Sequence, residues 1–464
     1  MNYSVLVIGG GAAGLAASMK LAEAGVHVVL VEKQPVLGGA LAGRLNNPWE
    51  KEIVIGGAGI PSTHVIAQHP RIEMLTSSEV VAIEGEPGQF RTTIRRRSRF
   101  VTDACTLCND CREVCPVVLP NEFEGGLTAR KAIHLPLPQA TPQSYVIDID
   151  HCLNEPPNYL ACQHCVEACA DHAIDFDSPP HQVCYREIGA VVLAVGGQAI
   201  SETSFDRYGY GHHPDIFTVT ELEGLLTPTG PTGGFVEKLT NEACPESLLF
   251  VLSNGVGSPP IDSVAYVGEL LEQGVGRVTV LHEGDAGNGS GKALTSRLGQ
   301  CRNVDVVNGK VRHVRTEEDH ILQVSYSKNG ANATVAAEMI VIAPPLGPPS
   351  GLRSLAELFA FELAPDGYVQ TQGSTAPAIE TTRAGVFAVG CAREPAAPSD
   401  CLIQADAVTD YVQRLLDRRQ VTSWPDHQSS SGEKAQILAG PDAGEAVRNQ
   451  IEQALWALLN RVEQ

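Results

Sequence analysis

After three residues the chain reads Ser4-Val5-Leu6-Val7-Ile8-Gly9-Gly10-Gly11-Ala12-Ala13-Gly14. Its first five residues have the apolar, β-branched composition of a buried strand, and its glycines fit the pattern G-x-G-x-x-G. Residues 15–22 read as a helix, and a second apolar run over 26–31 ends at Glu32. The order strand, glycine turn, helix, strand and carboxylate predicts a dinucleotide-binding unit.

The glycine turn predicts contact with a pyrophosphate. Where side chains are missing, backbone N–H groups and a helix N-terminus can reach the phosphates, and a carboxylate at the end of the second strand can accept from a ribose hydroxyl. The cofactor contacts expected in this region of the chain are Gly9, Gly10, Gly11, Ala12, Ala13, Gly14, Glu32, Lys33, Gly38 and Gly39. The alternative is a glycine-rich turn that binds no ligand.

Two later segments repeat the pattern of a buried strand followed by glycine. They are residues 190–197 and residues 384–391. With the opening motif they resemble the two-dinucleotide-binding-domain flavoproteins of the thioredoxin-reductase-like group. The resemblance implies that the bound dinucleotide is FAD rather than NAD, and it adds contacts from Val195, Gly196, Gly390 and Cys391. Cys391 stands where that group usually has Asp.

A second nucleotide-binding fold is expected in the middle of the chain. Residues 248–252 and 277–281 read as strands, and residues 264–272 as the helix between them. The turn over 253–262 lacks a complete glycine motif, and Pro259-Pro260 removes N–H donors that a pyrophosphate needs. We therefore expect an α/β protein with a Rossmann-like FAD domain and a degenerate second nucleotide domain that has lost its nicotinamide site.

Eight of the 13 cysteines form two spaced runs. The first run, Cys-x2-Cys-x2-Cys-x3-Cys-Pro, is the ligand pattern of bacterial ferredoxins, and the second keeps its later spacings after a nine-residue insertion. In two-cluster ferredoxins the fourth Cys of each run binds the other cluster. The expected ligands of the two [4Fe–4S] clusters are therefore Cys105, Cys108, Cys111 and Cys169 for one, and Cys152, Cys162, Cys165 and Cys115 for the other. Zinc and a dithiol redox centre are the alternatives.

The composition limits the partners. The 464 residues carry 54 Asp and Glu against 33 Lys and Arg, a formal net charge of −21, which argues against nucleic acid or an anionic membrane as the main partner. No run of about 20 apolar residues and no signal peptide is found, so we expect a cytoplasmic protein without a membrane helix. The five isolated cysteines are expected to be core residues without a role: Cys184, Cys244, Cys301, Cys391 and Cys401.

The stretches around the cysteine runs, at residues 116–127, 130–134 and 136–140, resemble the heterodisulfide reductase flavoproteins of the A type. Similarity continues at residues 208–211 and 230–234. The resemblance implies a flavin electron-transfer subunit of a cytoplasmic redox complex, with a bacterial ferredoxin domain inserted in the FAD domain. Some members of the family use FAD to bifurcate electrons. The implied partners are the B and C subunits of heterodisulfide reductase or electron donors of the hydrogenase or dehydrogenase type, around a homodimeric core.

The family often carries further cysteines near residue 250 and after the first helix, and none stands at those places here. No catalytic acid, base or nucleophile set is found. A self-contained NAD(P)H-dependent flavin and iron–sulfur oxidoreductase and a non-redox scaffold are the alternative functions. The expected domains are the first FAD-domain segment (1–98), the ferredoxin insert (99–183), the return to the FAD domain (184–235), the degenerate nucleotide domain (236–345), the last FAD-domain segment (346–420), and a linker with a C-terminal amphipathic helix (421–464).

Overall fold

The computed structural model describes residues 4–41, 59–154, 160–199, 205–228, 230–253, 262–283, 298, 301–317, 320–328, 330–373, 377–396 and 398–418. The predictions for the turn at 254–261 and for the tail from residue 421 lie outside these residues. Contacts divide the chain into one unit of residues 2–422 and another of residue 1 with residues 423–464. No helix in the described regions of the chain is both long enough and apolar enough to cross a membrane.

The opening motif lies in a seven-stranded sheet of order β22-β23-β24-β11-β1-β2-β3. Its parallel strands are β1 (Ser4–Ile8), β2 (His27–Val31), β3 (Ile72–Leu75), β11 (Ala190–Leu193) and β24 (Val386–Ala388). Two short antiparallel strands extend one edge: β22 (Thr371–Gln372) and β23 (Glu380–Thr381). The strands expected near both ends of the chain are thereby confirmed, and residues more than 350 apart lie in one sheet.

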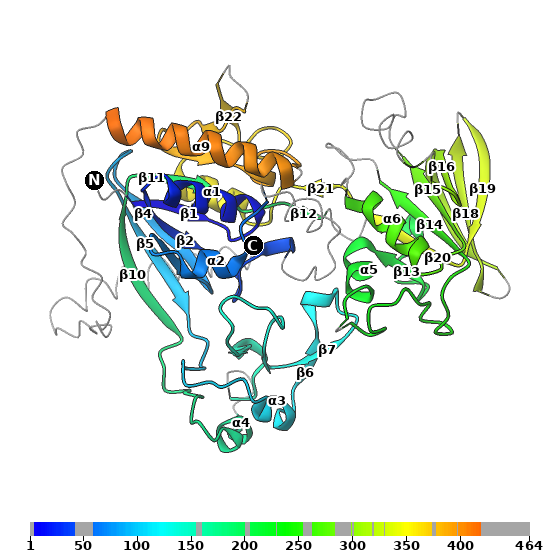
Figure 1. The fold of residues 1–464 in the computed structure, drawn as a ribbon, viewed down its shortest axis with the longest axis horizontal. Coiled ribbons are helices and arrows are strands. Elements are labelled where there is room, and N and C mark those ends of the chain that lie inside the picture. Colours follow the sequence, from blue (N-terminus) through cyan, green and yellow to red (C-terminus); the bar gives the residue numbers. More distant parts are fainter. Residues whose placement is uncertain are drawn as a thin grey trace, which may run out of the picture. The chain divides into compact units, whose positions relative to one another are not determined.

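Apolar layers cover both faces of this sheet because its strands carry apolar side chains on both sides. On one face Val5 and Val192 pack against the helices α1 (Ala12–Glu23) and α9 (Pro398–Arg418), which Figure 1 shows running alongside each other. On the other face Leu6 and Val191 pack against α8 (Leu352–Phe359) and an antiparallel sheet. That antiparallel sheet consists of β4 (Ser78–Glu84), β5 (Phe90–Arg97) and β10 (His181–Ile188).

A second parallel sheet has the order β13-β20-β14-β15-β16. Its strands are β13 (Ile216–Thr218), β14 (Ser247–Leu252), β15 (Arg277–His282), β16 (Val304–Asn308) and β20 (Met339–Ala343). Two helices belong to it, α5 (Val219–Leu225) and α6 (Asp262–Glu272), and an antiparallel sheet accompanies it, with β17 (Lys310–Thr316), β18 (Leu322–Lys328) and β19 (Ala331–Ala337). The expected second nucleotide-binding fold is therefore present. The short strands β12 (Gln198–Ala199) and β21 (Leu346–Gly347) pair as the chain passes between the two folds.

The cysteine-rich segment leaves the antiparallel sheet after β5 and returns to it at β10, so both ends of the insert are held by one strand pair. It contains few regular elements: α3 (Asp110–Val114), β6 (Val118–Pro120), η3 (Glu122–Glu124), β7 (Ala129–Lys131), β8 (Ile133–His134), β9 (Val146–Ile147), η4 (Ile149–His151) and α4 (His164–Ala168). Val101 and Ile174 form a single isolated antiparallel bridge. The remaining short elements are α2 (Thr63–Gln68), η1 (Gly39–Leu41), η6 (Asp206–Tyr208) and η8 (Gly390–Ala392).

Candidate functional site

Three glycines of the turn after β1 are packed so closely that a side chain on any of them would clash. A Cβ on Gly9, whose φ is +106°, would lie 2.3 Å from the carbonyl oxygen of Ala194, and one on Gly14 would lie 1.8 Å from the carbonyl oxygen of Gly9. A Cβ on Gly10 would lie 2.5 Å from Leu37. The turn is therefore fixed by contacts with the end of β11 and with the loop after β2, as phosphate-binding turns of this class are.

Glu32 connects the turn to the loop that follows β2. Its carboxylate is buried and accepts hydrogen bonds from the N–H of Gly10 at 2.6 Å and the N–H of Gln34 at 2.7 Å. Gly38 donates its N–H to the carbonyl of Gly10 at 2.8 Å, which closes the loop over the turn. An ionised carboxylate can accept about four hydrogen bonds, so Glu32 retains the capacity for a ribose hydroxyl. Lys33, by contrast, is exposed.

The third component of the predicted FAD site follows β24. The N–H of Gly390, at φ +63°, donates to the buried side chain of Gln404 at 2.5 Å. The Cys391 thiol donates to the carbonyl of Ala396 at 3.5 Å and accepts from the N–H of the same residue at 3.4 Å. Cys391 thus closes a short turn before α9. Gln404 carries no motif and was not predicted. The glycine turn, the Glu32 carboxylate and the turn at Gly390 and Cys391 together fit a dinucleotide. The turns would contact it through backbone groups, and Glu32 would contact it through its side chain.

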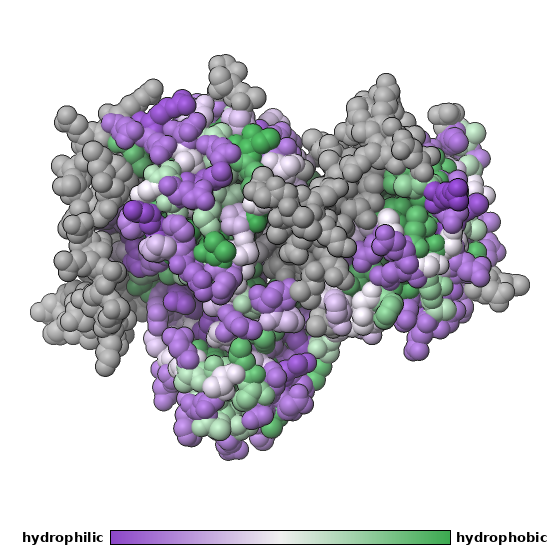
Figure 2. Space-filling view, in the orientation of Figure 1, coloured by the Kyte–Doolittle hydropathy of each residue, from purple (hydrophilic) through white to green (hydrophobic). Residues whose placement is uncertain are grey.

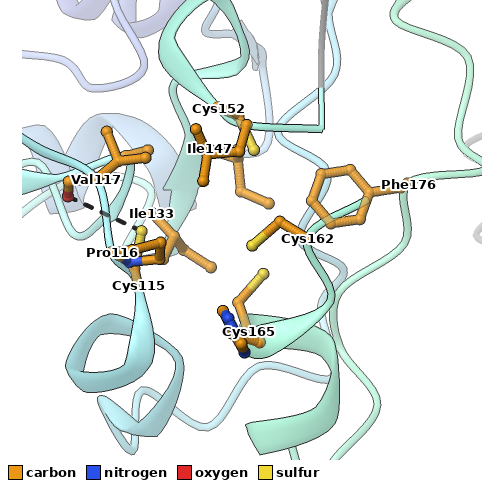
Figure 3. Close-up of a pocket in the computed structure, with 12 residues that line it drawn as sticks. Cys115, Pro116, Val117, Ile133, Ile147, Cys152, Cys162, Cys165 and Phe176 are labelled. Atoms are coloured by element: carbon orange, nitrogen blue, oxygen red, sulfur yellow. Dashed lines mark hydrogen bonds between the residues drawn. The ribbon is translucent and has the colours of Figure 1, made fainter. Parts of the chain in front are cut away.

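The eight clustered cysteines divide between two cavities, and the division crosses the two sequence runs. One cavity is lined by Cys105, Cys108, Cys111 and Cys169, and the other by Cys115, Cys152, Cys162 and Cys165. We refer to them as the Cys105 cavity and the Cys115 cavity. Figure 3 shows the sulfur atoms of Cys162 and Cys165 directed into the Cys115 cavity, between the side chains of Ile133, Ile147 and Phe176. Each cavity thus has four thiols, a donor set suited to a [4Fe–4S] cluster, and the Cys105 cavity is also lined by Thr106, Asn109 and Asp171.

The pKa values of two buried thiols reflect the same grouping of the cysteines. Burial, and then the nearby thiols of Cys105, Cys108 and Cys169, raise the pKa of Cys111 to about 11. Burial, and then Cys152, Cys162 and Cys115, raise the pKa of Cys165 to about 12. These thiols are protonated at neutral pH without a metal, so binding of iron would release protons. Among the described residues, no three His, Cys, Asp or Glu side chains are grouped closely enough to share a single metal ion.

Local backbone geometry brings the thiols to their cavities. Leu107 and Asn109 adopt positive φ angles of 62° and 74°, which turn the first run around the Cys105 cavity. Asn109 accepts a hydrogen bond from Tyr145, a buried residue that lines the same cavity. In the second run, Leu160 donates its N–H to the carbonyl of Leu153 at 3.0 Å. The nine-residue insertion is closed at its base by this bond, so Cys152 and Cys162 line one cavity.

The insert contacts the predicted FAD site through the loop after β2. Leu37 donates its N–H to the carbonyl of Thr141 at 2.9 Å, and Val36 packs with Leu137 and Ala140. Arg99 contacts Pro35 in the same loop. The loop therefore has the glycine turn on one side and the insert on the other. Sequence patterns contain no signal for these contacts, because the residues that make them belong to no motif.

The second nucleotide fold has a different environment at the corresponding place. Glu283 follows its second strand, β15, as Glu32 follows β2, but its side chain is 1% exposed. One carboxylate oxygen accepts from Arg207 at 2.7 Å and from the Tyr208 hydroxyl at 2.8 Å, and the other accepts from the N–H of Val311 at 2.8 Å. The Glu283 carboxylate therefore accepts hydrogen bonds from three groups of the protein itself.

The isolated cysteines do not all behave as predicted. Cys401 is buried, whereas Cys184 and Cys391 are partly exposed. Cys244 and Cys301 are exposed, so the expectation that all five are core residues is wrong for these two. Cys244 lies in a loop before β14 and Cys301 in a turn before β16, where the backbone remains at the surface.

Two histidines lie near the cysteine cavities. His134 is buried, and its Nδ1 lies 3.2 Å from the carbonyl oxygen of Ala132. His164 lines the Cys115 cavity. Burial, and then Arg130, lower the pKa of His134, so its ring is neutral at neutral pH.

Comparison with known proteins gives relatives over most of the chain. A family model described as FAD dependent oxidoreductase matches residues 4–92. The iron–sulfur A subunit of CoB–CoM heterodisulfide reductase from Methanocaldococcus jannaschii is 30% identical over 429 residues, covering 89% of this chain and 64% of the relative. An iron–sulfur A subunit of the same enzyme from Methanopyrus kandleri is 32% identical over 427 residues, covering 87% of this chain and 63% of the relative.

A third relative is longer. The A subunit of ferredoxin:CoB–CoM heterodisulfide reductase from Methanosarcina mazei is 30% identical over 442 residues, covering 91% of this chain and 54% of the relative. The chain therefore spans between about half and two thirds of these curated relatives. Among solved structures, the thioredoxin reductase of Lactococcus lactis covers 90% of this chain and all of its own, with 14% identity and a TM-score of 0.49.

Proposed function

We propose that the chain, which is 30–32% identical to A subunits of heterodisulfide reductase over most of its length, is an FAD- and iron–sulfur-containing electron-transfer subunit of a redox complex. FAD would be held by the glycine turn, Glu32 and the Gly390–Cys391 turn. Two [4Fe–4S] clusters would be held by the Cys105 and Cys115 cavities. FAD exchanges electrons in pairs and iron–sulfur clusters exchange them singly, and the protein supplies binding, distance and electrostatics.

The observation that carries the proposal is the crossed division of the cysteines. Each cavity takes three thiols from one run and the fourth from the other, as the two-cluster ferredoxin pattern requires. A zinc site would need four ligands at about 2.3 Å from one ion, and zinc remains the alternative that metal analysis distinguishes. The insert also joins the FAD loop directly at Leu37 and Thr141, which favours electron exchange between the two cofactors.

The partner is proposed to be another redox subunit that docks on the insert. Residues 99–183 contain twelve Asp and Glu against four Lys and Arg. Val114, Val118 and Leu160 are among the exposed large apolar residues of the described chain, and Figure 2 shows hydrophobic and hydrophilic residues intermixed on the visible face of the insert. Transient redox contacts bury small interfaces, and a surface of this mixed kind is compatible with one. An acidic insert favours a partner with a basic surface.

A self-contained NAD(P)H oxidoreductase is the second candidate, and Glu283 argues against it. A carboxylate after the second strand normally accepts from the adenosine ribose. Here both oxygens are engaged by Arg207, Tyr208 and Val311. The Glu283 side chain is 1% exposed and already accepts three hydrogen bonds, so it offers little acceptor surface to a ribose.

The test is an anaerobic preparation with flavin, iron, sulfide and zinc analysis. We expect one FAD per chain, iron and sulfide for two [4Fe–4S] clusters, and no zinc. Cys111→Ser and Cys165→Ser should each remove one cluster, whereas Cys184→Ser, which changes a cysteine outside both cavities, should remove neither. Zinc in place of iron would refute the cluster assignment. A protein that binds neither flavin nor iron would be a scaffold.

Bifurcation at the FAD is the finer form of the proposal. It predicts that one electron donor reduces two acceptors of different potential only when both acceptors are present. Transfer to either acceptor alone would contradict bifurcation and leave a simple relay.

A further inference from the structure

Arg99 joins three segments at the base of the insert. Its Nη2 donates to the carbonyl of Pro35 and to the Thr76 hydroxyl at 3.1 Å, and its Nη1 donates to the carbonyl of Ser144 at 3.4 Å. Pro35 lies in the loop of the proposed FAD site, and Thr76 follows β3. Ser144 precedes Tyr145, which lines the Cys105 cavity. The guanidinium therefore lies between the two proposed cofactor sites.

The positive charge of Arg99 has no close counterion in the described regions of the chain. Its three partners are neutral oxygens, and its Nε is buried without a hydrogen-bond partner. Burial, and then Arg96, lower the pKa of the guanidinium to about 10, against a smaller opposite effect of Asp103. A buried cation that lacks a paired anion is unfavourable, so a compensating negative charge is expected nearby.

The two sites beside Arg99 would supply that charge. A bound dinucleotide carries a negative pyrophosphate, and a cluster held by four thiolates carries a net negative charge. We propose that Arg99 is a positioning residue whose charge is balanced by FAD and by the cluster of the Cys105 cavity, and that it raises the reduction potential of both cofactors. The inference rests on the proposed function, because it requires both cofactors to be bound.

The direction of the expected effect on the reduction potentials follows from the positive charge of Arg99. Reduction adds negative charge to either cofactor, and a nearby cation in a medium of low dielectric constant stabilises the reduced form more than the oxidised form. Removing the cation should therefore make both cofactors harder to reduce.

The test is a redox titration of the cofactor-loaded protein, with FAD followed by absorbance and the clusters by electron paramagnetic resonance. In Arg99→Met we expect the midpoint potentials of FAD and of one cluster to shift to lower values, and in Arg99→Lys to stay near those of the original protein. The matched control is Arg91→Met, because Arg91 lies on β5, is exposed, and pairs with Glu187 at 3.8 Å. Its potentials should not change.

Unchanged potentials in a fully loaded Arg99→Met would overturn the inference, as would an equal shift in Arg91→Met. If Arg99→Met does not bind FAD and the clusters, the variants Arg99→Gln and Arg99→Lys distinguish a requirement for charge from a requirement for shape. Loading of the Lys variant alone supports a requirement for charge, and failure of all three shows that shape rather than charge is needed. Absence of flavin and iron from the original protein would instead refute the proposed function.

Discussion

Glu32 makes two backbone hydrogen bonds from a buried position, to Gly10 in the glycine turn and to Gln34 in the next loop. The residue therefore has two tasks, since it fixes the shape of the turn and offers acceptor capacity to a ribose. Hydrogen bonds to a charged group contribute about 1.5–3 kcal/mol each.

Glu32→Ala should weaken FAD binding about 10- to 100-fold, because one charge-assisted bond is lost directly and the turn loses its support. The measurement is the dissociation constant of FAD for flavin-depleted protein. Glu23→Ala, at an exposed position on α1, is the control and should leave binding unchanged. Equal binding by both variants would contradict the placement of FAD at this turn.

Cys115→Ser tests the crossed ligation at a single residue. Cys115 belongs to the first run but lines the cavity of the second. We expect the variant to lose the cluster of Cys152, Cys162 and Cys165 and to keep the other, so that its spectrum matches that of Cys165→Ser rather than that of Cys111→Ser. A match to Cys111→Ser would mean that the runs bind their clusters without crossing.

At this scale the sequence predicts residues that belong to motifs and misses those that support them. The glycines, Glu32 and the eight cysteines follow from fixed spacings. Gln404 and Arg99 act through contacts with distant segments, at Gly390 and Pro35, and their neighbours in sequence give no indication of this. Such contacts appear only once the chain has folded.

Secondary-structure elements can be predicted from this sequence where burial is continuous. The strands β1, β11 and β14 are apolar over nearly their whole length because both faces of a parallel sheet are covered, and such runs stand out in a sequence. The insert is different. Its strands are two or three residues long, so no periodicity can develop in them, and only the cysteine spacing indicates the structure.

Within the second nucleotide fold, Glu338 ties the start of β20 to neighbouring segments. It accepts from Lys238 at 2.8 Å and from the N–H of Glu246 at 2.9 Å. Burial works to raise the pKa of its carboxyl, but the hydrogen bonds from Lys238 and Glu246 outweigh burial and hold the pKa below its ordinary value. The carboxylate therefore stabilises the fold when it is ionised.

Glu338→Gln should destabilise this fold by about 1–2 kcal/mol at neutral pH. Because the pKa is lower in the folded state than in the unfolded state, the advantage of Glu is complete above the ordinary value of 4.5 and is lost as the pH falls through the lowered value. Thermal unfolding from pH 7 down to about pH 2.5 measures the difference across the range in which it should disappear. The exposed Glu357→Gln on α8 is the control. A difference that stays constant to low pH would contradict the ionised pair.

At the scale of the molecule, the two nucleotide-binding folds differ in the contacts of the carboxylate that follows their second strand. Glu32 contacts a glycine turn, whereas Glu283 is paired with Arg207. The similarity of the folds is visible in the sequence, and the difference in the use of the carboxylate is not, because Arg207 lies outside the strand pattern.

NADH or NADPH should not reduce the isolated protein rapidly, because ribose binding would compete with the Arg207 pair. Anaerobic mixing monitored at the flavin absorbance maximum measures this, with dithionite as the positive control. Rapid bleaching by NADH would show that the second fold is a working nicotinamide site and would favour the self-contained oxidoreductase.

The crossed cavities also impose an order on biosynthesis. With the proposed ligation, the Cys105 cavity is incomplete until Cys169 has left the ribosome, and Cys115 must wait for Cys152, Cys162 and Cys165. At about 5–20 residues per second, the three thiols of the first run would remain without their fourth partner for roughly 3–12 s. Neither cluster can mature on a nascent chain that ends before Cys165, so cluster delivery has to follow translation of nearly the whole insert.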